Sequence, residues 1–378
     1  MESERNRDGA RFWLLEFSWD KSSMISNESA KTWFAWRLRF ILARLKGQSR
    51  SRRNKRRVLC LLSGGLGDKL MALPAIRYLR SEFANSEMTM IVSGVMPPFF
   101  NVESDCVIPL SKSNIWQRLA VAGRGFDCCF VNSIGLFDIG MELAAFVSGA
   151  SDRRGPRSPD MSDRDTVYDR PFAFGEGHET VVNLRGAGGR TSATRVPYAL
   201  NIPEADLSPA DQDLIVVHAG SSASGLPNRW APSNFARVAR ECADNGKRVI
   251  LVGTSSEWAL LEKIKQESHS SVEIACDRPL ADVALLLKRA GCVVANDSGI
   301  GHLAASVGAR LITIMGATNP DKVAPVGPNV RILGTRCPHG GCYWLNHPSD
   351  CARCVDLITP EEVLALALDE AWIHAGQG

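Results

Sequence analysis

The sequence predicts an α/β fold made of two Rossmann-like domains that face each other across a cleft. Short apolar runs alternate with helical patterns, which is typical of parallel sheets with helices on both faces. The alternation begins near residue 58 and restarts near residue 214, and each half has a glycine-rich turn after its first strand. A length of 378 residues fits two domains, because single cores stop growing well below this size. We therefore divide the chain into residues 1–55, 56–208 and 209–378.

The composition favours a soluble globular protein, with 45% hydrophobic and 22% charged residues. A net charge of +3 provides no strong field for a nucleic-acid partner. No apolar run approaches the roughly 20 residues that a membrane span needs, and no signal-peptide pattern is apparent. Eleven cysteines in a chain of this length do not resemble a secreted disulfide scaffold. These observations predict a cytoplasmic protein.

Residues 1–55 form an extension that contains a basic amphipathic pattern. "KTWFAWRLRFILARLK" (31–46) places apolar side chains on one helical stripe, and "RSRRNKRR" (50–57) follows as a basic run. Such a helix beside a polybasic segment is typical of proteins that bind an anionic membrane surface. The alternative is a helix packed on its own domain, followed by a solvated charge run.

Residues 56–208 predict the first Rossmann-like domain. The pattern indicates strands at "VLCLL", "MTMIV" and "DCCFV", and an apolar helix follows around residues 136–147. Residues 151–170 are rich in Arg, Asp, Pro and Ser, so we expect surface loops there.

Residues 209–378 predict the second domain. "LIVVH", "RVILVG", "CVVA" and "RLITIMG" read as buried strands separated by helical patterns. Ligands of such folds bind at the carboxyl ends of the strands, so the cleft between the two halves is the expected active site.

"ANDSGIGH" (295–302) follows one of these strands directly and opens a helix. We expect Asp297 to cap that helix, and Ser298 and Gly299 to let a ligand approach the free backbone N–H groups. A helix N-terminus attracts phosphate, and His302 would lie within the first turn beside it. The alternative is an ordinary helix cap with a hydrogen-bonded histidine.

"HAGSSASGLPNRW" (218–230) also follows a strand. His218, Ser221 and Ser222 can hydrogen-bond a phosphate or a sugar, and Arg229 can hold a phosphate with two N–H groups. The alternative, a surface loop without function, is less favoured because both motifs lie at the same edge of the same sheet.

"SGGLGD" (63–68) is a tight glycine turn that carries one carboxylate, Asp68, to the start of a helix. It matches neither a nicotinamide fingerprint nor a Walker A loop, because the third glycine and the Gly-Lys-Ser/Thr ending are missing. Asp68 is a candidate general base facing the cleft, and Gly65, Gly67 and Lys69 lie beside it in the sequence. The alternative is a capping aspartate.

"CPHGGCYWLNHPSDCARC" contains Cys337, Cys342, Cys351 and Cys354. Close cysteine pairs in a reducing compartment suggest a structural site for zinc or iron. Free thiols or a labile disulfide are the alternatives.

These motifs, in this order, resemble glycosyltransferase family 9, the heptosyltransferases that act in lipopolysaccharide synthesis. The resemblance rests on "SGGLGDKLMALPAIRYLRSEF", "HAGSSASGLPNRWAPSNFARVA" and "ANDSGIGHLAASVGARLITIMGATNP". It implies a GT-B fold and an inverting transfer that needs no cofactor for catalysis. By this resemblance Asp68 matches the catalytic base, and Gly65, Gly67 and Lys69 lie on the acceptor side of the cleft. Arg229 stands where the family often has lysine, and Asp297, Gly299 and His302 match the donor site. "HAG" departs from the usual His-Pro-Gly, and the cysteines are similar to the iron-binding cysteines of autotransporter heptosyltransferases.

The resemblance implies transfer of a sugar, most simply heptose from ADP-heptose, to a lipopolysaccharide core-type or other glycan acceptor. Such an enzyme is expected to be cytoplasmic and peripheral to the inner membrane. Two other functions fit the same architecture: a nucleotide-sugar epimerase and a non-catalytic, membrane-bound protein that binds sugar nucleotides.

Overall fold

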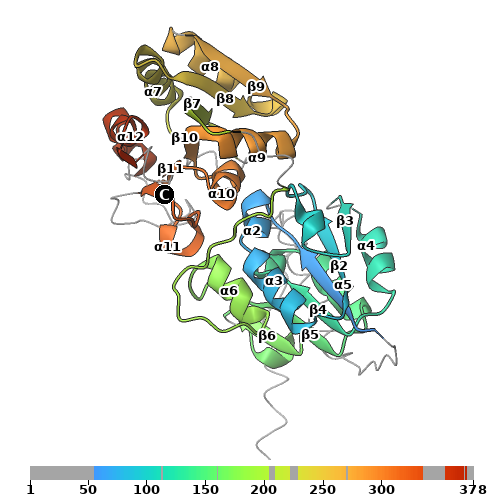
Figure 1. The fold of residues 1–378 in the computed structure, drawn as a ribbon. Helices are drawn as coiled ribbons and strands as arrows, with labels where there is room; N and C mark the ends of the chain where they lie inside the picture. The colour runs from blue at the N-terminus through green and yellow to red at the C-terminus, as the bar shows by residue number, and fades with distance from the viewer. Residues whose placement is uncertain are drawn as a thin grey trace, which may run out of the picture.

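The computed structural model describes residues 55–111, 114–159, 161–203, 209–221, 229–269, 271–334, 354–369 and 371–372 (Figure 1). It contains two six-stranded sheets, ordered β3-β2-β1-β4-β5-β6 and β12-β11-β10-β7-β8-β9. Every strand pair in both sheets is parallel. The predicted α/β fold with two Rossmann-like halves is thereby confirmed. The basic amphipathic segment 31–46 and most of the cysteine cluster lie outside the described residues.

The N-terminal half places its two most apolar strands at the centre of the sheet. β1 and β4 are fully buried along almost their whole lengths, as the runs "VLCLL" and "CCFV" predict. The strands are β1 (Arg57–Leu62), β2 (Glu87–Ser93), β3 (Cys106–Leu110), β4 (Cys128–Val131), β5 (Asp152–Arg157) and β6 (Arg170–Ala173). The helices are α2 (Leu66–Leu70), α3 (Leu73–Glu82), α4 (Ile115–Ala122), α5 (Ile139–Val147) and α6 (Glu179–Gly186), with 3-10 turns η2 (Phe100–Val102), η3 (Ser133–Phe137) and η4 (Asp163–Asp165).

The C-terminal half repeats the design around a fully buried central strand, β10. Its strands are β7 (Asp211–His218), β8 (Arg248–Gly253), β9 (Val272–Cys276), β10 (Ala290–Asn296), β11 (Leu311–Ile314) and β12 (Val330–Leu333). Its helices are α7 (Pro232–Asp244), α8 (Trp258–Ser268), α9 (Leu280–Arg289), α10 (Gly299–Ser306), α11 (Pro320–Val323) and α12 (Pro360–Ala367), with 3-10 turns η7 (Ser255–Glu257) and η8 (Cys354–Leu357). No helix in these ranges is long and apolar enough to span a membrane.

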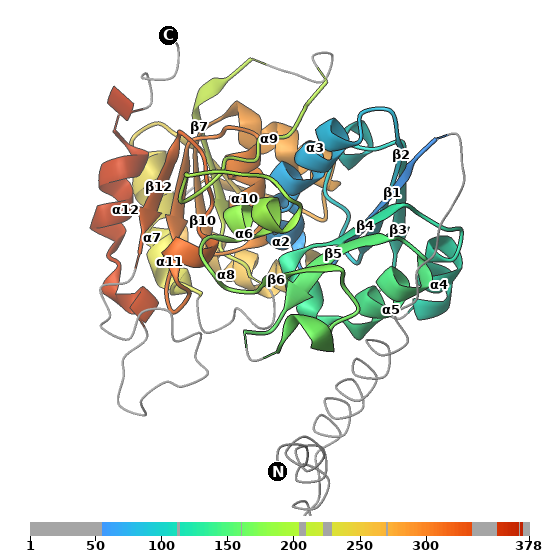
Figure 2. The ribbon, with the colours of Figure 1, turned by 90° about the horizontal axis from the view of Figure 1, so that it is seen from below.

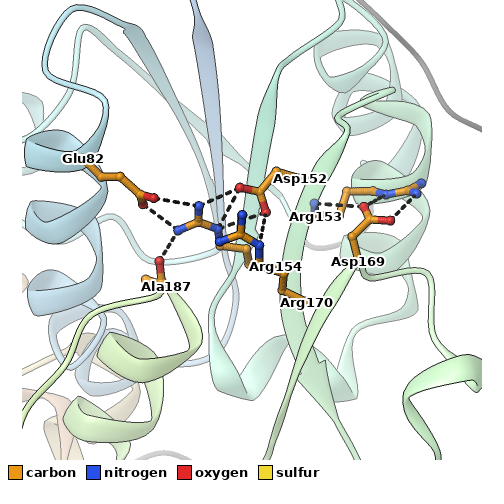
Figure 3. Close-up of polar contacts among 7 residues, drawn as sticks. All are labelled: Glu82, Asp152, Arg153, Arg154, Asp169, Arg170 and Ala187. Atoms are coloured by element: carbon orange, nitrogen blue, oxygen red, sulfur yellow. Dashed lines mark hydrogen bonds and ion pairs between the residues drawn. The ribbon is translucent and has the colours of Figure 1, made fainter.

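The expectation that residues 151–170 are surface loops is wrong, because the segment begins with β5 and ends at the first residue of β6. Two arginines of β5 are buried, since acidic groups neutralise them (Figure 3). Arg154 binds Glu82 at 2.7 Å and Asp152 at 2.6 Å, and it also donates to the carbonyl of Ala187 at the end of α6. Arg153 pairs with Asp169 at 2.9 Å. Arg153 and Arg154, two of the charged residues that suggest a loop, therefore belong to internal ion pairs of the sheet.

The two halves meet where the helices after their central strands pack together. α2 follows β1, α10 follows β10, and the two helices lie side by side in both views (Figures 1 and 2). One continuous apolar cluster extends across this contact and includes Leu66 and Leu70 of α2 and Leu303 of α10. Because α2 follows β1 and α10 follows β10, the carboxyl ends of these two central strands lie near this contact. Ligands of such folds bind at the carboxyl ends of the strands.

Candidate functional site

Asp68 lies in the first turn of α2, with its carboxylate folded back onto the glycine turn. The backbone N–H of Gly65 donates to Asp68 Oδ2 at 2.6 Å. Gly64 has a φ of +88°, and a Cβ there would lie 2.5 Å from Asp68 Oδ2, so only glycine allows this turn. The negative charge at a helix N-terminus is stabilised by the backbone dipoles. The turn thus holds a half-buried carboxylate at the contact between the halves.

Lys69 is buried beneath the same turn. Its exposed fraction is 0%, and its ammonium donates to the carbonyl of Gly64 at 2.7 Å and that of Gly65 at 3.3 Å. These contacts orient the turn that carries Asp68, and we therefore expect Lys69 to act on the site by holding that backbone.

The start of α10 is capped by Ser298, which corrects the expectation that Asp297 caps it. Ser298 Oγ accepts from the backbone N–H of Gly301 at 3.4 Å, whereas Asp297 Oδ2 accepts from the Thr318 hydroxyl at 2.5 Å. The reason is that Asp297 still hydrogen-bonds in register with the sheet, through its N–H to the carbonyl of Ile314. Burial raises the pKa of Asp297, and the charge of Asp68 raises it further. Asp68 and Asp297 therefore lie within electrostatic reach of each other across the contact.

His302 is buried between three segments of the chain. Its Nδ1 lies 2.6 Å from the Tyr198 hydroxyl, and its ring lies so close to Gly67 that a Cβ there would be 2.5 Å from Cδ2. Burial lowers the pKa of His302 to about 3, so the imidazole is neutral at physiological pH. Two predicted residues, Gly67 and His302, are thus in direct contact although they belong to different halves.

Two of the predicted residues that follow β7, Ser221 and Arg229, hydrogen-bond to each other. Arg229 donates through Nε to Ser221 Oγ at 3.0 Å and through Nη2 to the Ser221 carbonyl at 2.6 Å. His218, at the end of β7, donates through Nδ1 to the carbonyl of Val252 at 3.0 Å. Burial lowers the pKa of His218, and the neutral ring leaves Nε2 as an acceptor. Ser222 lies outside the described residues.

Two residues of this edge were missed by the motif analysis. Glu257, in η7 after β8, lies 3.8 Å from Arg229 Nη2. Asn296 ends β10 and is fully buried; its amide donates to the carbonyl of Ala219 at 2.7 Å and accepts from the N–H of Trp230 at 3.1 Å. The rule that places ligands at carboxyl ends of strands could have identified both, because each closely follows or ends a buried strand.

The N-terminal half contributes a second carboxyl group, which sequence reasoning also missed. Glu179 starts α6, is buried, and accepts a short hydrogen bond from the Ser133 hydroxyl. Asn183 completes this network by donating to Ser133 Oγ at 3.1 Å. Burial raises the pKa of Glu179 to about 7, and the charge of Asp68 contributes to the rise. The sequence "GEGHET" gave no motif signal for this position.

The predicted metal ligands can be located only for Cys354, which is buried in η8. Cys337, Cys342 and Cys351 lie outside the described residues. Within the described ranges, no group of three or more His, Cys, Asp or Glu side chains has the arrangement of a metal site.

The arrangement combines two chemistries at one contact. The N-terminal half supplies a carboxylate on a glycine turn, which can accept a proton. The C-terminal half supplies a helix N-terminus, a guanidinium group and neutral imidazoles, which together suit an anionic ligand such as a diphosphate.

Comparison with known proteins finds similarity to heptosyltransferases. Residues 194–347 match the family model described as glycosyltransferase family 9 (heptosyltransferase). Lipopolysaccharide heptosyltransferase 2 of Escherichia coli K12 is 25% identical over 114 residues, which cover 29% of this chain and 33% of that protein. The chain thus aligns with about a third of the length of that relative. Lipopolysaccharide heptosyltransferase 1 of Pseudomonas aeruginosa is 23% identical over 316 residues, covering 76% of this chain and 86% of the relative.

The fold also matches a solved structure. The structure of ADP-heptose lipopolysaccharide heptosyltransferase II of E. coli superposes with a TM-score of 0.64 at 18% identity, covering 83% of this chain and 99% of that one. The GT-B arrangement that the family resemblance implies is thereby confirmed.

Proposed function

We propose that this chain is a glycosyltransferase whose active site lies at the edge of the contact between α2 and α10, because residues 194–347 match the model of glycosyltransferase family 9. Its donor is a nucleotide diphosphate sugar, ADP-heptose in the simplest case, and its acceptor is a lipopolysaccharide core-type glycan. One observation carries the proposal. The glycine turn that bears Asp68 meets α10, whose N-terminus is suited to bind phosphate, and Gly67 contacts His302 there.

The donor binds to the C-terminal half in this mechanism. The start of α10 at Ser298 and Gly299 receives the diphosphate, and Arg229 adds a charge-assisted contact. These groups stabilise the negative charge that develops on the leaving diphosphate. In this proposal His218, Ser221 and Ser222 contact the nucleotide part, and Glu257, 3.8 Å from Arg229, accepts from a hydroxyl group of the ligand.

The acceptor binds to the N-terminal half. Asp68 removes the proton from the attacking hydroxyl as the new bond to the anomeric carbon forms and the bond to the diphosphate breaks. Attack from the face opposite the leaving group inverts the anomeric centre. The reaction needs no metal, because Arg229 and the helix N-terminus neutralise the diphosphate. Gly65 and Gly67 have no side chains and so leave room for the acceptor beside the turn.

The direct test is Asp68→Asn, assayed for sugar transfer and for donor binding. We expect turnover to fall by about 10²–10⁴-fold, which is the usual contribution of general-base catalysis, while ADP affinity stays unchanged. A turnover loss below tenfold would remove Asp68 from this role. Product analysis without acceptor excludes or supports the epimerase alternative, since an epimerase converts its sugar nucleotide without one.

We also propose that residues 31–56 hold the enzyme at the anionic surface of the inner membrane, where a lipid-linked acceptor resides. Arg57 is left out of this segment because it begins β1 and pairs with Glu87. Each basic residue near such a surface contributes about 1 kcal/mol at low salt. Deletion of residues 1–55 should leave transfer to a soluble acceptor intact and reduce sedimentation with anionic liposomes. Equal liposome binding by the shortened chain would reject this attachment.

The cysteine cluster remains a separate proposal. Cys337, Cys342, Cys351 and Cys354 would hold one structural zinc or iron per chain. Elemental analysis of protein prepared without chelator should find about one metal ion per chain, and metal-free folded protein would contradict the site.

A further inference from the structure

Tyr198 belongs to the segment that connects α6 to β7, and its hydroxyl meets the buried face of His302. The residue is 1% exposed, its Oη lies 2.6 Å from His302 Nδ1, and the two rings stack with centroids 6.0 Å apart. The two residues are 104 positions apart in the sequence. A residue of the connection between the halves therefore contacts the histidine of the proposed donor site.

The hydrogen-bond pattern around the Tyr198 hydroxyl determines which atom carries the proton. The backbone N–H of Val326 donates to Tyr198 Oη at 3.4 Å and so occupies one lone pair. Within the described part of the chain, His302 Nδ1 is the acceptor recorded for the hydroxyl proton. If the imidazole donated instead, a buried O–H would lack a partner, at a cost of about 1–3 kcal/mol. The hydroxyl therefore donates to Nδ1, and the neutral ring carries its proton on Nε2.

The Nε2 edge of the ring faces the contact between the two halves. A Cβ on Gly67 would lie 3.1 Å from His302 Nε2 and 2.5 Å from Cδ2. Gly67 directly precedes Asp68, and Gly299 at the start of α10 lies against Leu66 of the same turn. A ligand bound at the edge of the contact between α2 and α10 therefore lies beside the Nε2–H group.

We propose that Tyr198 is a positioning residue that keeps His302 in the Nε2–H tautomer, so that the ring donates a hydrogen bond to the anionic donor sugar nucleotide. This inference rests on the proposed glycosyltransferase function. A neutral N–H group of fixed direction stabilises the charge that develops on the leaving diphosphate, whereas a bare Nε2 lone pair would repel it. Without the tyrosine hydroxyl, nothing in the described contacts of Nδ1 favours the productive tautomer.

The test is Tyr198→Phe, which preserves the ring and removes only the hydroxyl. Nitrogen-15 NMR of histidine-labelled protein should show the Nε2–H pattern for His302 in the unmodified enzyme and a changed tautomer in the variant, with His302→Gln identifying the signal. Turnover should fall about tenfold, as expected for the loss of one hydrogen bond, while the KM for the acceptor stays the same.

A matched control is Tyr168→Phe, because Tyr168 is also 1% exposed but lies in the core of the N-terminal half. It should leave the His302 signals and turnover unchanged. An unaltered His302 tautomer in Tyr198→Phe, or an altered tautomer with full turnover, would overturn the positioning role. The NMR result needs no substrate, so a failure of the unmodified enzyme to transfer any sugar would reject the proposed function separately.

Discussion

Gly67 and His302 touch across the contact between the two halves of the protein. A side chain as small as a methyl group at Gly67 would lie 2.5 Å from His302 Cδ2 and 3.0 Å from Cγ. Gly67 directly precedes Asp68, the candidate base, so this contact places that turn against His302 of the proposed donor site. It also makes glycine necessary at position 67 for reasons of space.

The first prediction concerns this contact. Gly67→Ala should destabilise the protein by about 1–3 kcal/mol, the usual cost of overpacking, and reduce transfer because the halves can no longer approach. His302→Ala in the same chain should relieve the clash, so the two substitutions should be strongly non-additive in urea unfolding. Additive free energies of unfolding would mean that the methyl group is accommodated without meeting the ring.

The second prediction concerns Arg229. Its alanine variant should weaken ADP binding by roughly 1.5–3 kcal/mol, because a charge-assisted contact to phosphate is lost. Arg237→Ala is the matched control, since Arg237 is 43% exposed on α7 and pairs with Glu241 and Glu361. Isothermal calorimetry should separate the two variants. Equal ADP affinities would place the diphosphate elsewhere.

The third prediction concerns the pH dependence of stability through Glu179. Its pKa in the folded protein is about 7, above the ordinary value of 4.5, so the folded state binds a proton that the unfolded state releases. Stability is therefore lost as pH rises from about 4.5 through 7. The side chain in Glu179→Gln cannot ionise. The free energy of unfolding of this variant, relative to that of the unmodified protein, should therefore increase by up to about 3 kcal/mol between pH 5 and pH 8.5.

Denaturant unfolding at the two pH values tests this prediction. Glu176→Gln, in the exposed loop just before α6, serves as the control. Its free energy of unfolding relative to the unmodified protein should not change between the two pH values. If the difference in free energy of unfolding between Glu179→Gln and the unmodified chain is the same at both pH values, folding does not raise the pKa of Glu179, and the side chain is charged in the folded protein.

The fourth prediction compares two arginines that share one partner. Arg154 is 1% exposed and Arg170 is 60% exposed, and both pair with Asp152 (Figure 3). Arg154→Ala removes the buried guanidinium that binds Glu82 and Asp152 and leaves the buried carbonyl of Ala187 without this donor, so it should cost about 3–5 kcal/mol. Arg170→Ala should cost less than about 1 kcal/mol, because solvent screens an exposed pair. Thermal unfolding that ranks them equally would contradict the internal role of Arg154.

The sequence by itself determined the local elements and the chemistry at their ends. Buried strands such as β1 and β10 are continuous apolar runs, and the glycine, serine and acidic residues that follow them mark strand-to-helix turns. The motifs around Asp68, Arg229 and His302 were recognisable because each is contained within a few residues.

Only the tertiary structure decided which distant residues meet. Arg154 looks like a loop residue until Glu82, 72 positions away, neutralises it. Glu179 acquires its raised pKa from burial, which outweighs the lowering effect of the hydrogen bond from Ser133, and Tyr198 contacts His302 across 104 positions. The physical reason is that burial, charge pairing and proton placement depend on groups from separate elements, and no local pattern along the chain encodes those distances.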